Sequence, residues 1–423
     1  MKGKDDIDYF KNNAEENQAV NRLIRQTKKA LLSGIYLDSE LNELRSNYSK
    51  ALILIGKGAQ RAGIEISKRT FEDAVKHELF HIAAHLAELL AIIFAESGTL
   101  PKQQRYFTKA SQELTHLNSI HNQVITTYIE VRTALTGRSS YTAAVKAKLD
   151  SLSNSLSSIT IRAKKTQFYA TMVHVIRDFA HQDYARAALR CADSIHQARG
   201  ASQKSALIQL RAVAAIAAGK YEMAESGLKE GLEVAGKYLT SWHILQYYRC
   251  IALFHKGDFK TASVIQQQAA KRKQTPVMIE PWAVVRAYLW IFCGGKFRLG
   301  KFFNETVQIS KDKAGHNVNI IIADLMVSLI RDRDRFLHRI EAVQTYVYRH
   351  LKGAQHERTR AFLQLLFLAP ECNFNFRLVR SRGAKHIKVL QKRSIYANHN
   401  LEIEIVPYLH LFELMIDEKR RAV

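Results

Sequence analysis

A short motif recurs at a nearly constant interval in the middle of the chain, and it limits the folds that the chain can adopt. In each copy an aromatic residue follows a polar or glycine-containing turn. The aromatics are Tyr184, Tyr221, Phe259, Phe297 and, in a degenerate fifth copy, Phe336, which lie 37, 38, 38 and 39 residues apart. Self-similarity at such a period is typical of arrays in which each unit packs on its neighbours.

The residues around each aromatic predict a helical hairpin. A glycine two residues before the aromatic ends one helix in a left-handed cap, and the aromatic opens a second helix that packs back on the first. A small residue three positions after the aromatic allows the two helices to approach closely. The glycines are Gly219, Gly257 and Gly295, and the small residues are Ala187, Ala224, Ala262 and Gly300.

The pattern resembles the tetratricopeptide (TPR) repeat over about residues 165–351, and the scarcity of turn residues, with 5 prolines and 19 glycines in 423 residues, agrees with a helical chain. The units depart from that family because they exceed its roughly 34 residues. They also lack its terminal proline, and Arg339 occupies the small position of the fifth copy. The resemblance implies an all-α fold, an α-solenoid of stacked antiparallel helical hairpins in a right-handed superhelix.

Three segments are expected along the chain. Residues 1–150 form N-terminal helical hairpins, with amphipathic stretches at 39–63 and 70–95. Residues 151–368 contain the TPR-like repeats of 37–39 residues, and residues 369–423 contain a basic segment and a C-terminal capping helix. The serine-rich stretch 151–158 predicts a bend or boundary, with 137–140 as a second candidate.

The formal charge of +24 favours polyanionic partners, either acidic proteins or nucleic acid. No apolar run in the sequence reaches the roughly 18–20 residues that a membrane span needs, and residues 1–13 lack the apolar centre of a secretory signal. We therefore expect a cytoplasmic protein with no membrane partner. The four cysteines form no CxxC pair and are expected to be structural thiols, and no cofactor is expected.

An HExxH motif at 77–81 is followed by His85 and Glu88. In zinc hydrolases this spacing places two imidazoles on the metal and a glutamate beside its water. On one continuous helix His77, His81, His85 and Glu88 would share a sector, but the apolar residues of the stretch centre on the opposite side. We therefore predict no metal site here and keep a zinc hydrolase as the third functional alternative.

A second cluster is basic and lies near the C-terminus. Its cations can neutralise several phosphates, whereas the simpler interpretation is a solvated helix surface. The candidate residues for binding anions or nucleic acid are Arg377, Arg380, Arg382, Lys385, Lys388, Lys392 and Arg393.

The leading functional hypothesis is a non-enzymatic scaffold or adaptor that binds an acidic protein or peptide segment in a concave groove. In the TPR family, ligands lie along the first helices of successive repeats, which here correspond to 165–179, 202–216, 240–253 and 281–292. The alternative is a nucleic-acid-binding accessory protein that uses the basic cluster. The groove candidates are Arg177, Lys204, Arg211, His243, Tyr247, Arg249 and Arg286.

Overall fold

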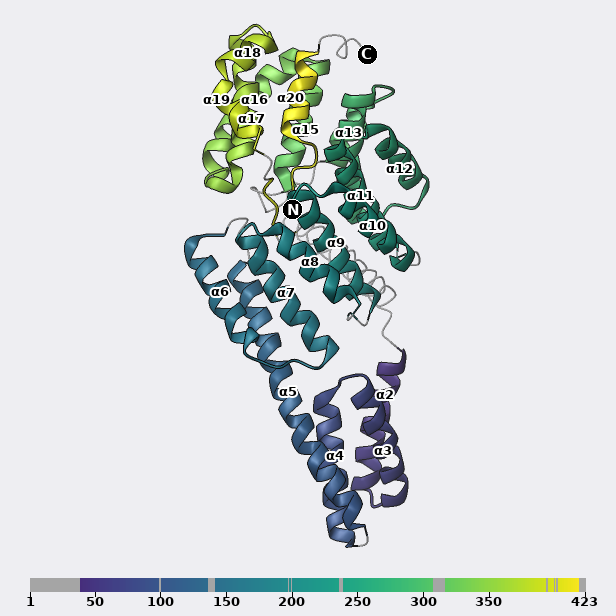
Figure 1. Cartoon of the computed structure of the whole chain (residues 1–423). Helices are drawn as coiled ribbons and strands as arrows, with labels where there is room; N and C mark the ends of the chain where they lie inside the picture. The colour runs from purple at the N-terminus through teal and green to yellow at the C-terminus, as the bar shows by residue number, and fades with distance from the viewer. Residues whose placement is uncertain are drawn as a thin grey trace, which may run out of the picture. The chain divides into compact units, whose positions relative to one another are not determined.

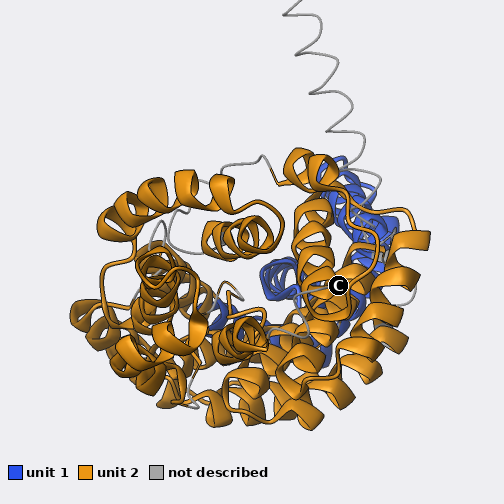
Figure 2. Ribbon diagram, turned by 90° about the horizontal axis from the view of Figure 1, so that it is seen from above, with its two compact units in different colours: residues 1–121 blue, residues 122–423 orange. Residues whose placement is uncertain are grey.

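A computed structural model of the chain describes residues 39–98, 100–135, 141–196, 198, 200–235, 239–306, 316–392, 395–398, 400 and 402–417. Within these ranges the secondary structure is helical, apart from one isolated antiparallel bridge between Ala397 and Ile403 (Figure 1). The all-α prediction is confirmed. The chain divides into two compact units, residues 1–121 and 122–423, which are coloured separately in Figure 2. The division falls inside one long helix, α5 (Pro101–Leu135), and not at residue 150.

Unit 1 contains α2 (Ser39–Gly56), α3 (Gln60–Lys76), α4 (Phe80–Ser97) and the first part of α5. Three aromatic rings form its centre, because the ring of Phe107 lies 5.4 Å from that of Phe71 and 5.9 Å from that of Phe94. The amphipathic stretch 70–95 is two helices and not one. Glu78, between α3 and α4, has a φ of +55°, and a residue in this left-handed conformation ends a helix.

Unit 2 continues from the last part of α5 through a series of helices, in which each helix packs against the next from α6 to α14 and again from α15 to α20. In addition, α9 contacts α11, α11 contacts α13, and α13 contacts α15. The helices are α6 (Ala143–Ser157), α7 (Lys164–Ala180), α8 (Tyr184–Ile195), α9 (Ala201–Ala217), α10 (Tyr221–Ala235), α11 (Leu239–Lys256), α12 (Phe259–Lys271), α13 (Pro276–Cys293), α14 (Leu299–Glu305), α15 (His316–Arg331), α16 (Arg333–His350), the 3-10 turn η1 (Ala354–His356), α17 (Glu357–Glu371), α18 (Phe376–Arg382), α19 (Ala384–Leu390) and α20 (Tyr408–Ile416).

The stretch 151–158, predicted as a bend or boundary, contains no break before its end: α6 runs through it to Ser157, and Ser158 caps the helix. Serine is only a mild helix breaker, and here the hydroxyls of Ser155 and Ser157 donate hydrogen bonds to backbone carbonyls of the same helix. The second candidate boundary, 137–140, lies outside the described residues.

The repeat motif marks helix starts as the sequence predicts. The second helices α8, α10 and α12 begin at Tyr184, Tyr221 and Phe259. The turns before them share one left-handed residue, with φ of +59° at Gln182, +74° at Gly219 and +79° at Gly257. A glycine adopts this conformation without the steric cost that other residues pay, which explains its recurrence.

An aspartate after the left-handed residue completes two of these turns. The side chain of Asp183 accepts the backbone N–H of Arg186, and that of Asp258 accepts the N–H of Thr261. Each bond satisfies one of the donors left free at a helix N-terminus.

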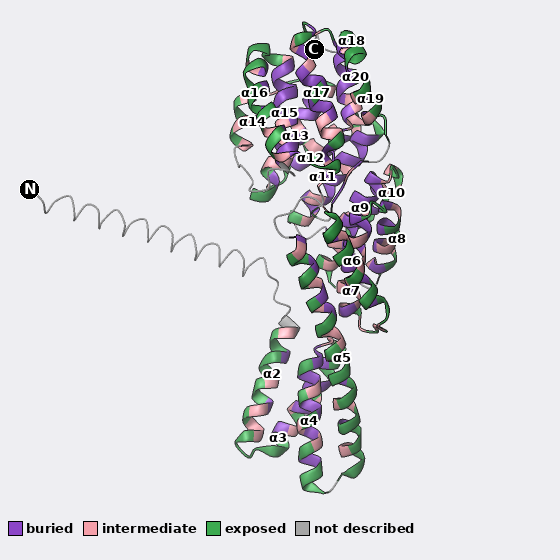
Figure 3. Ribbon diagram, turned by 90° about the vertical axis from the view of Figure 1, so that its left-hand side faces the viewer, coloured by how far each residue is buried: buried purple, intermediate pink, exposed green. Residues whose placement is uncertain are grey.

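Buried and exposed residues alternate along the helices (Figure 3). The aromatics of the repeat differ in burial, which the repeat alone does not reveal. Tyr184 and Phe336 are buried, with 3% and 0% of their surface exposed, whereas Tyr221, Phe259 and Phe297 are only half-buried. The small residues three positions after the aromatics also differ in burial. The first three, Ala187, Ala224 and Ala262, are buried, unlike Gly300.

The fourth copy departs from the motif. Gly300 is exposed, and a Cβ built on it would meet no atom within 4 Å, so it does not serve close helix packing. Its helix, α14, has only 7 residues. The role predicted for Gly300 is therefore wrong.

Two described helices, α4 and α13, are long and apolar enough to cross a membrane by length and composition, contrary to the expectation that no segment reaches this limit. In α4, 44% of the residues are buried inside the fold, and in α13 the share is 56%. The core helices of compact proteins have the same composition, so this is weak evidence for a membrane span.

We expect Phe336→Ala to lower the free energy of unfolding by about 3–5 kcal/mol, because the ring is fully enclosed. Phe259→Ala should cost less, about 1–2 kcal/mol, because the ring is half-buried. Urea unfolding followed by circular dichroism measures both. Equal losses in the two variants would show that the repeat positions are packed alike.

Candidate functional site

The segment between α19 and α20, residues 395–407, lies against helices that are far from it in sequence; we call it the C-terminal segment. The Tyr184 hydroxyl, at the start of α8, accepts the N–H of Ala397 at 3.0 Å and donates to the carbonyl of the same residue at 3.2 Å. His255 Nε2, near the end of α11, donates to the carbonyl of Glu404 at 2.8 Å. Asn319 Nδ2, on α15, donates to the carbonyl of Ile403 at 3.4 Å. The C-terminal segment is thus held mainly through its backbone.

A buried ion pair fixes the far end of the C-terminal segment. Arg358, on α17, donates from Nε and Nη2 to the two carboxylate oxygens of Glu404, at 3.0 and 3.1 Å. The same guanidinium donates from Nη1 to the carbonyls of Leu390 and Lys392, and the N–H of Tyr408 donates to Glu404. Burial alone would lower the pKa of Arg358, but the Glu404 carboxylate raises it above its usual value.

Glu404 also affects the pKa of His255, which is buried beneath the C-terminal segment. Burial, with smaller contributions from His410 and Arg358, lowers the pKa of His255 to about 4, although Glu404 acts in the opposite direction. The Tyr221 ring lies 5.6 Å from the imidazole. His255 is therefore neutral at physiological pH.

The residues that surround the C-terminal segment were mostly not predicted. Of the groove candidates, only Tyr247 is among them. It belongs to a pocket of about 300 Å³ between the first helices and the C-terminal segment, lined also by Gln209, Ile244, Tyr248, Met278, Pro281, Asn319, Asn400, Glu402 and Ile403. No local pattern points to these residues, because the pocket exists only once the distant C-terminal segment is in place.

Four predicted groove arginines pair with carboxylates of neighbouring helices instead of meeting in one groove. Each pair joins two helices: α7 to α6, α9 to α10, α11 to α10, and α13 to α14. The pairs are Arg177 with Asp150 at 2.7 Å, Arg211 with Glu230 at 3.9 Å, Arg249 with Glu225 at 3.7 Å, and Arg286 with Glu305. These arginines stabilise helix packing.

His243 and Lys204 complete the predicted set. His243 is fully buried; its Nε2 donates to the carbonyl of Lys273 at 3.1 Å, and its Nδ1 accepts the indole N–H of Trp282 at 3.2 Å. Burial lowers its pKa. His243 is thus a core residue and is not presented to a partner, because its polar atoms have intrachain partners. Lys204 is half-buried on α9.

The HExxH motif does not lie on one helix. His77 is the C-terminal cap of α3, Glu78 is left-handed, and His81 and His85 belong to α4. The Nδ1 atom of His85 is 2.7 Å from the Tyr48 hydroxyl. The helix break at Glu78 removes His77 from the sector expected for the four residues, whereas His81, His85 and Glu88 remain on α4. Among the described residues no group of three or more His, Cys, Asp or Glu side chains is placed to hold a metal.

The basic cluster falls on α18 and α19, both of which pack on α17. Lys392, just after α19, lies 3.5 Å from Glu357, and Arg393 lies outside the described residues. The remaining five, Arg377, Arg380, Arg382, Lys385 and Lys388, are exposed.

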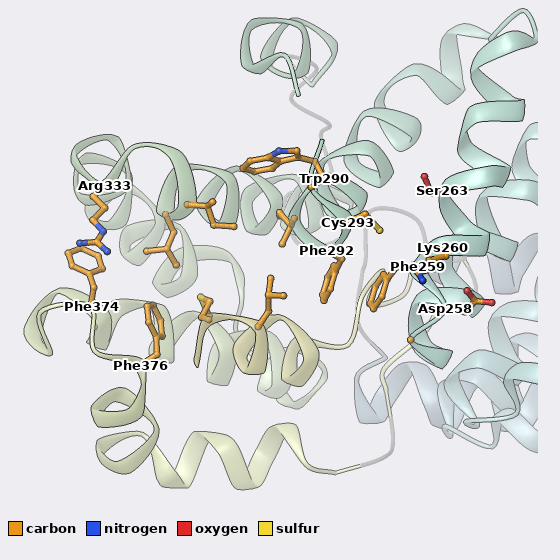
Figure 4. A pocket seen from close by; sticks show the side chains of 17 residues that line it. Asp258, Phe259, Lys260, Ser263, Trp290, Phe292, Cys293, Arg333, Phe374 and Phe376 are labelled. Carbon is orange, nitrogen blue, oxygen red and sulfur yellow. The ribbon is translucent and has the colours of Figure 1, made fainter. Parts of the chain in front are cut away.

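An open apolar pocket of about 930 Å³ lies between α12, α13, α15, the start of α16, α18 and α20 (Figure 4). At one end the rings of Phe259 and Phe292 stack with centroids 3.9 Å apart. At the other end the Arg333 guanidinium lies 4.8 Å from the centre of the Phe374 ring. Exposed Lys260 lies beside the stacked rings.

Comparison with known proteins found no matching family, no similar curated protein and no similar solved structure. The functional argument therefore rests on this geometry.

We expect the stability of the protein to fall as the pH drops from about 6.5 to about 4. In this window the unfolded chain binds a proton at His255 that the folded chain excludes, which costs up to about 3 kcal/mol. Urea unfolding at several pH values should give a shallower decline for His255→Gln, which keeps an amide donor and does not titrate. Identical slopes in the two proteins would contradict the assignment.

Cys293 lines the open pocket and is exposed, whereas Cys191, Cys250 and Cys372 are buried. We expect a maleimide to label Cys293 alone in the native protein and all four thiols after unfolding, as counted by mass spectrometry. Burial raises the pKa of Cys191 to about 12, which removes its thiolate at neutral pH. Rapid labelling that persists in Cys293→Ser would contradict this arrangement.

Proposed function

We propose that this protein is a non-enzymatic helical-repeat scaffold, with a TPR-like α-solenoid in unit 2, that binds a segment of another protein. The solenoid is supported by the recurring hairpin turns before Tyr184, Tyr221 and Phe259, and by the contacts of α9 with α11 and of α11 with α13. In such arrays function lies in the surfaces that the units present.

The site proposed for the partner is the open pocket beside Phe259 and Phe374. One observation supports this choice. The cavity has a volume of about 930 Å³, is lined by stacked aromatic and aliphatic side chains, and has cations at both ends. The inner face of the first helices α9, α11 and α13 is a poorer candidate, because the C-terminal segment lies beside it, at His255 and around the pocket of about 300 Å³.

The occupant proposed is an amphipathic segment whose apolar side chains enter the pocket and whose carboxylates lie over Lys260 and Arg333. The volume is near the upper end of roughly 300–1,000 Å³ found for binding clefts and has room for several side chains. The two exposed cations and the overall charge of +24 favour an acidic partner over a basic one. A helix laid in an apolar groove is a common form of such recognition.

Two synthetic amphipathic peptides of about 18 residues, or five helical turns, test this proposal. They carry the same leucine and phenylalanine face, and their polar positions are glutamate in one and lysine in the other. We expect the glutamate peptide to bind, as measured by fluorescence anisotropy, and to slow maleimide labelling of Cys293. The double variant Lys260→Glu/Arg333→Glu should weaken its binding by about tenfold, which corresponds to about 1.4 kcal/mol.

The matched control is Lys220→Glu/Lys271→Glu, which changes the net charge equally at exposed lysines that do not line the pocket. It should leave the affinity within about twofold of the original. Equal weakening in both double variants, or no protection of Cys293 by the glutamate peptide, would reject the site. Protection by a small apolar compound alone would indicate a small-molecule pocket instead.

A further inference from the structure

The surface of α18 and α19 carries positive charge without compensating acids. Residues 372–401 contain seven lysines and arginines and no aspartate or glutamate. Arg377, Arg380, Arg382, Lys385 and Lys388 are exposed, and within the described residues none of them has an ion pair. We call these five residues the α18–α19 basic surface.

Three other arginines of unit 2 behave differently. Arg190 pairs with Asp178 at 2.9 Å, Arg339 pairs with Asp324, and Arg358 pairs with Glu404. Each of these pairs links two separate elements of the fold. The cations of the α18–α19 basic surface serve no such structural role, so their charge is available to a partner.

The basic surface is also held rigidly. The Asn375 side chain accepts the N–H groups of Arg377 and Leu378 and so fixes the start of α18. Gly383 joins the two helices at a point where a Cβ would lie 2.3 Å from a Leu365 side-chain carbon and 2.9 Å from the Val379 carbonyl. Both helices pack on α17 and α20. The cations therefore extend from a fixed base, which lowers the entropy lost when they bind.

We propose that the α18–α19 basic surface binds the phosphate backbone of duplex DNA without sequence preference. Arginine and lysine neutralise phosphates directly, and arginine can fork onto two oxygens. This activity is separate from the pocket, because none of the five residues lines it.

Three features of residues 376–392 favour duplex DNA over other polyanions. Phe376, the one aromatic other than His386, is buried, so the bases of a single strand would find no phenyl or indole ring on which to stack. Residues 376–392 contain no carboxylate to accept a hydrogen bond from a ribose 2′-hydroxyl, which removes the strongest acceptor that could select RNA. Leu378 is the one large apolar side chain with substantial exposure, which is little for the apolar centre of a protein interface.

The test is fluorescence anisotropy of the full chain with a labelled duplex DNA of about 20 base pairs, at several salt concentrations. We expect the triple variant Arg377→Gln/Arg380→Gln/Lys388→Gln to bind at least tenfold more weakly at low salt. Its slope of log affinity against log salt should be lower in magnitude by about 3, because each phosphate contact contributes about 0.9.

The matched control is Lys220→Gln/Lys271→Gln/Lys296→Gln, which removes the same charge at exposed positions elsewhere in unit 2. A control that retains the original slope, with thermal unfolding unchanged in both variants, would support the proposal. Equal weakening in the two triple variants would overturn the proposal, because the net charge of the whole protein, and not this surface, would then account for DNA binding. Failure to bind DNA would also overturn it.

Competing ligands separate the other sources of negative charge. Duplex RNA or single-stranded DNA of the same sequence binding more tightly than the duplex DNA would overturn the choice of ligand. Polyglutamate displacing the DNA at equal charge concentration would overturn it in favour of an acidic protein. Because Lys260 and Arg333 are unchanged in these variants, the peptide test of the pocket can fail or succeed independently.

Discussion

The buried ion pair between Arg358 and Glu404 holds the C-terminal part of the fold together. Taking two such charges out of water is expensive, and the cost is offset only when the geometry is good and the remaining hydrogen-bonding groups are satisfied. Here the Glu404 carboxylate receives two guanidinium donors and the N–H of Tyr408, while the third guanidinium nitrogen reaches carbonyls after α19. The ion pair thus joins α17, the end of α19, the C-terminal segment and, through Glu404, the start of α20. Removal of either partner would leave an uncompensated buried charge.

This anchoring decides which surfaces of unit 2 remain open. The C-terminal segment contacts His255 on α11 and shares a pocket with residues of α9, α11 and α13, so three of the helices expected to form a ligand groove already face a peptide that belongs to the same chain. That contact uses backbone groups of the segment, as recognition of an extended peptide does. The open surfaces lie farther along the chain, at the aromatic pocket and on α18 and α19.

The arginines illustrate how a local pattern and its structural role can diverge. Arg249 and Arg286 occur on first helices, where a groove was expected, yet each lies beside a glutamate of an adjacent helix. Whether an arginine faces a ligand or a neighbouring carboxylate depends on which side of the helix packs against the next one. The arginines and lysines of α18 and α19 had the same local character in the sequence, but within the described residues none of them forms an ion pair.

The sequence by itself determined the helical class and the turns of the repeats. Glycine before Tyr221 and Phe259 predicted left-handed caps, because the steric preference of a single residue is a local property. The sequence also located the cluster of arginines and lysines on α18 and α19, since the density of charged residues can be read directly from the chain. The prediction that the HExxH stretch lies on one continuous helix was wrong, because Glu78 adopts a left-handed conformation that glutamate does not favour. Tertiary structure alone decided the partners of Tyr184 and Arg358, because hydrogen bonds between residues 213 and 46 positions apart depend on the path of the whole chain.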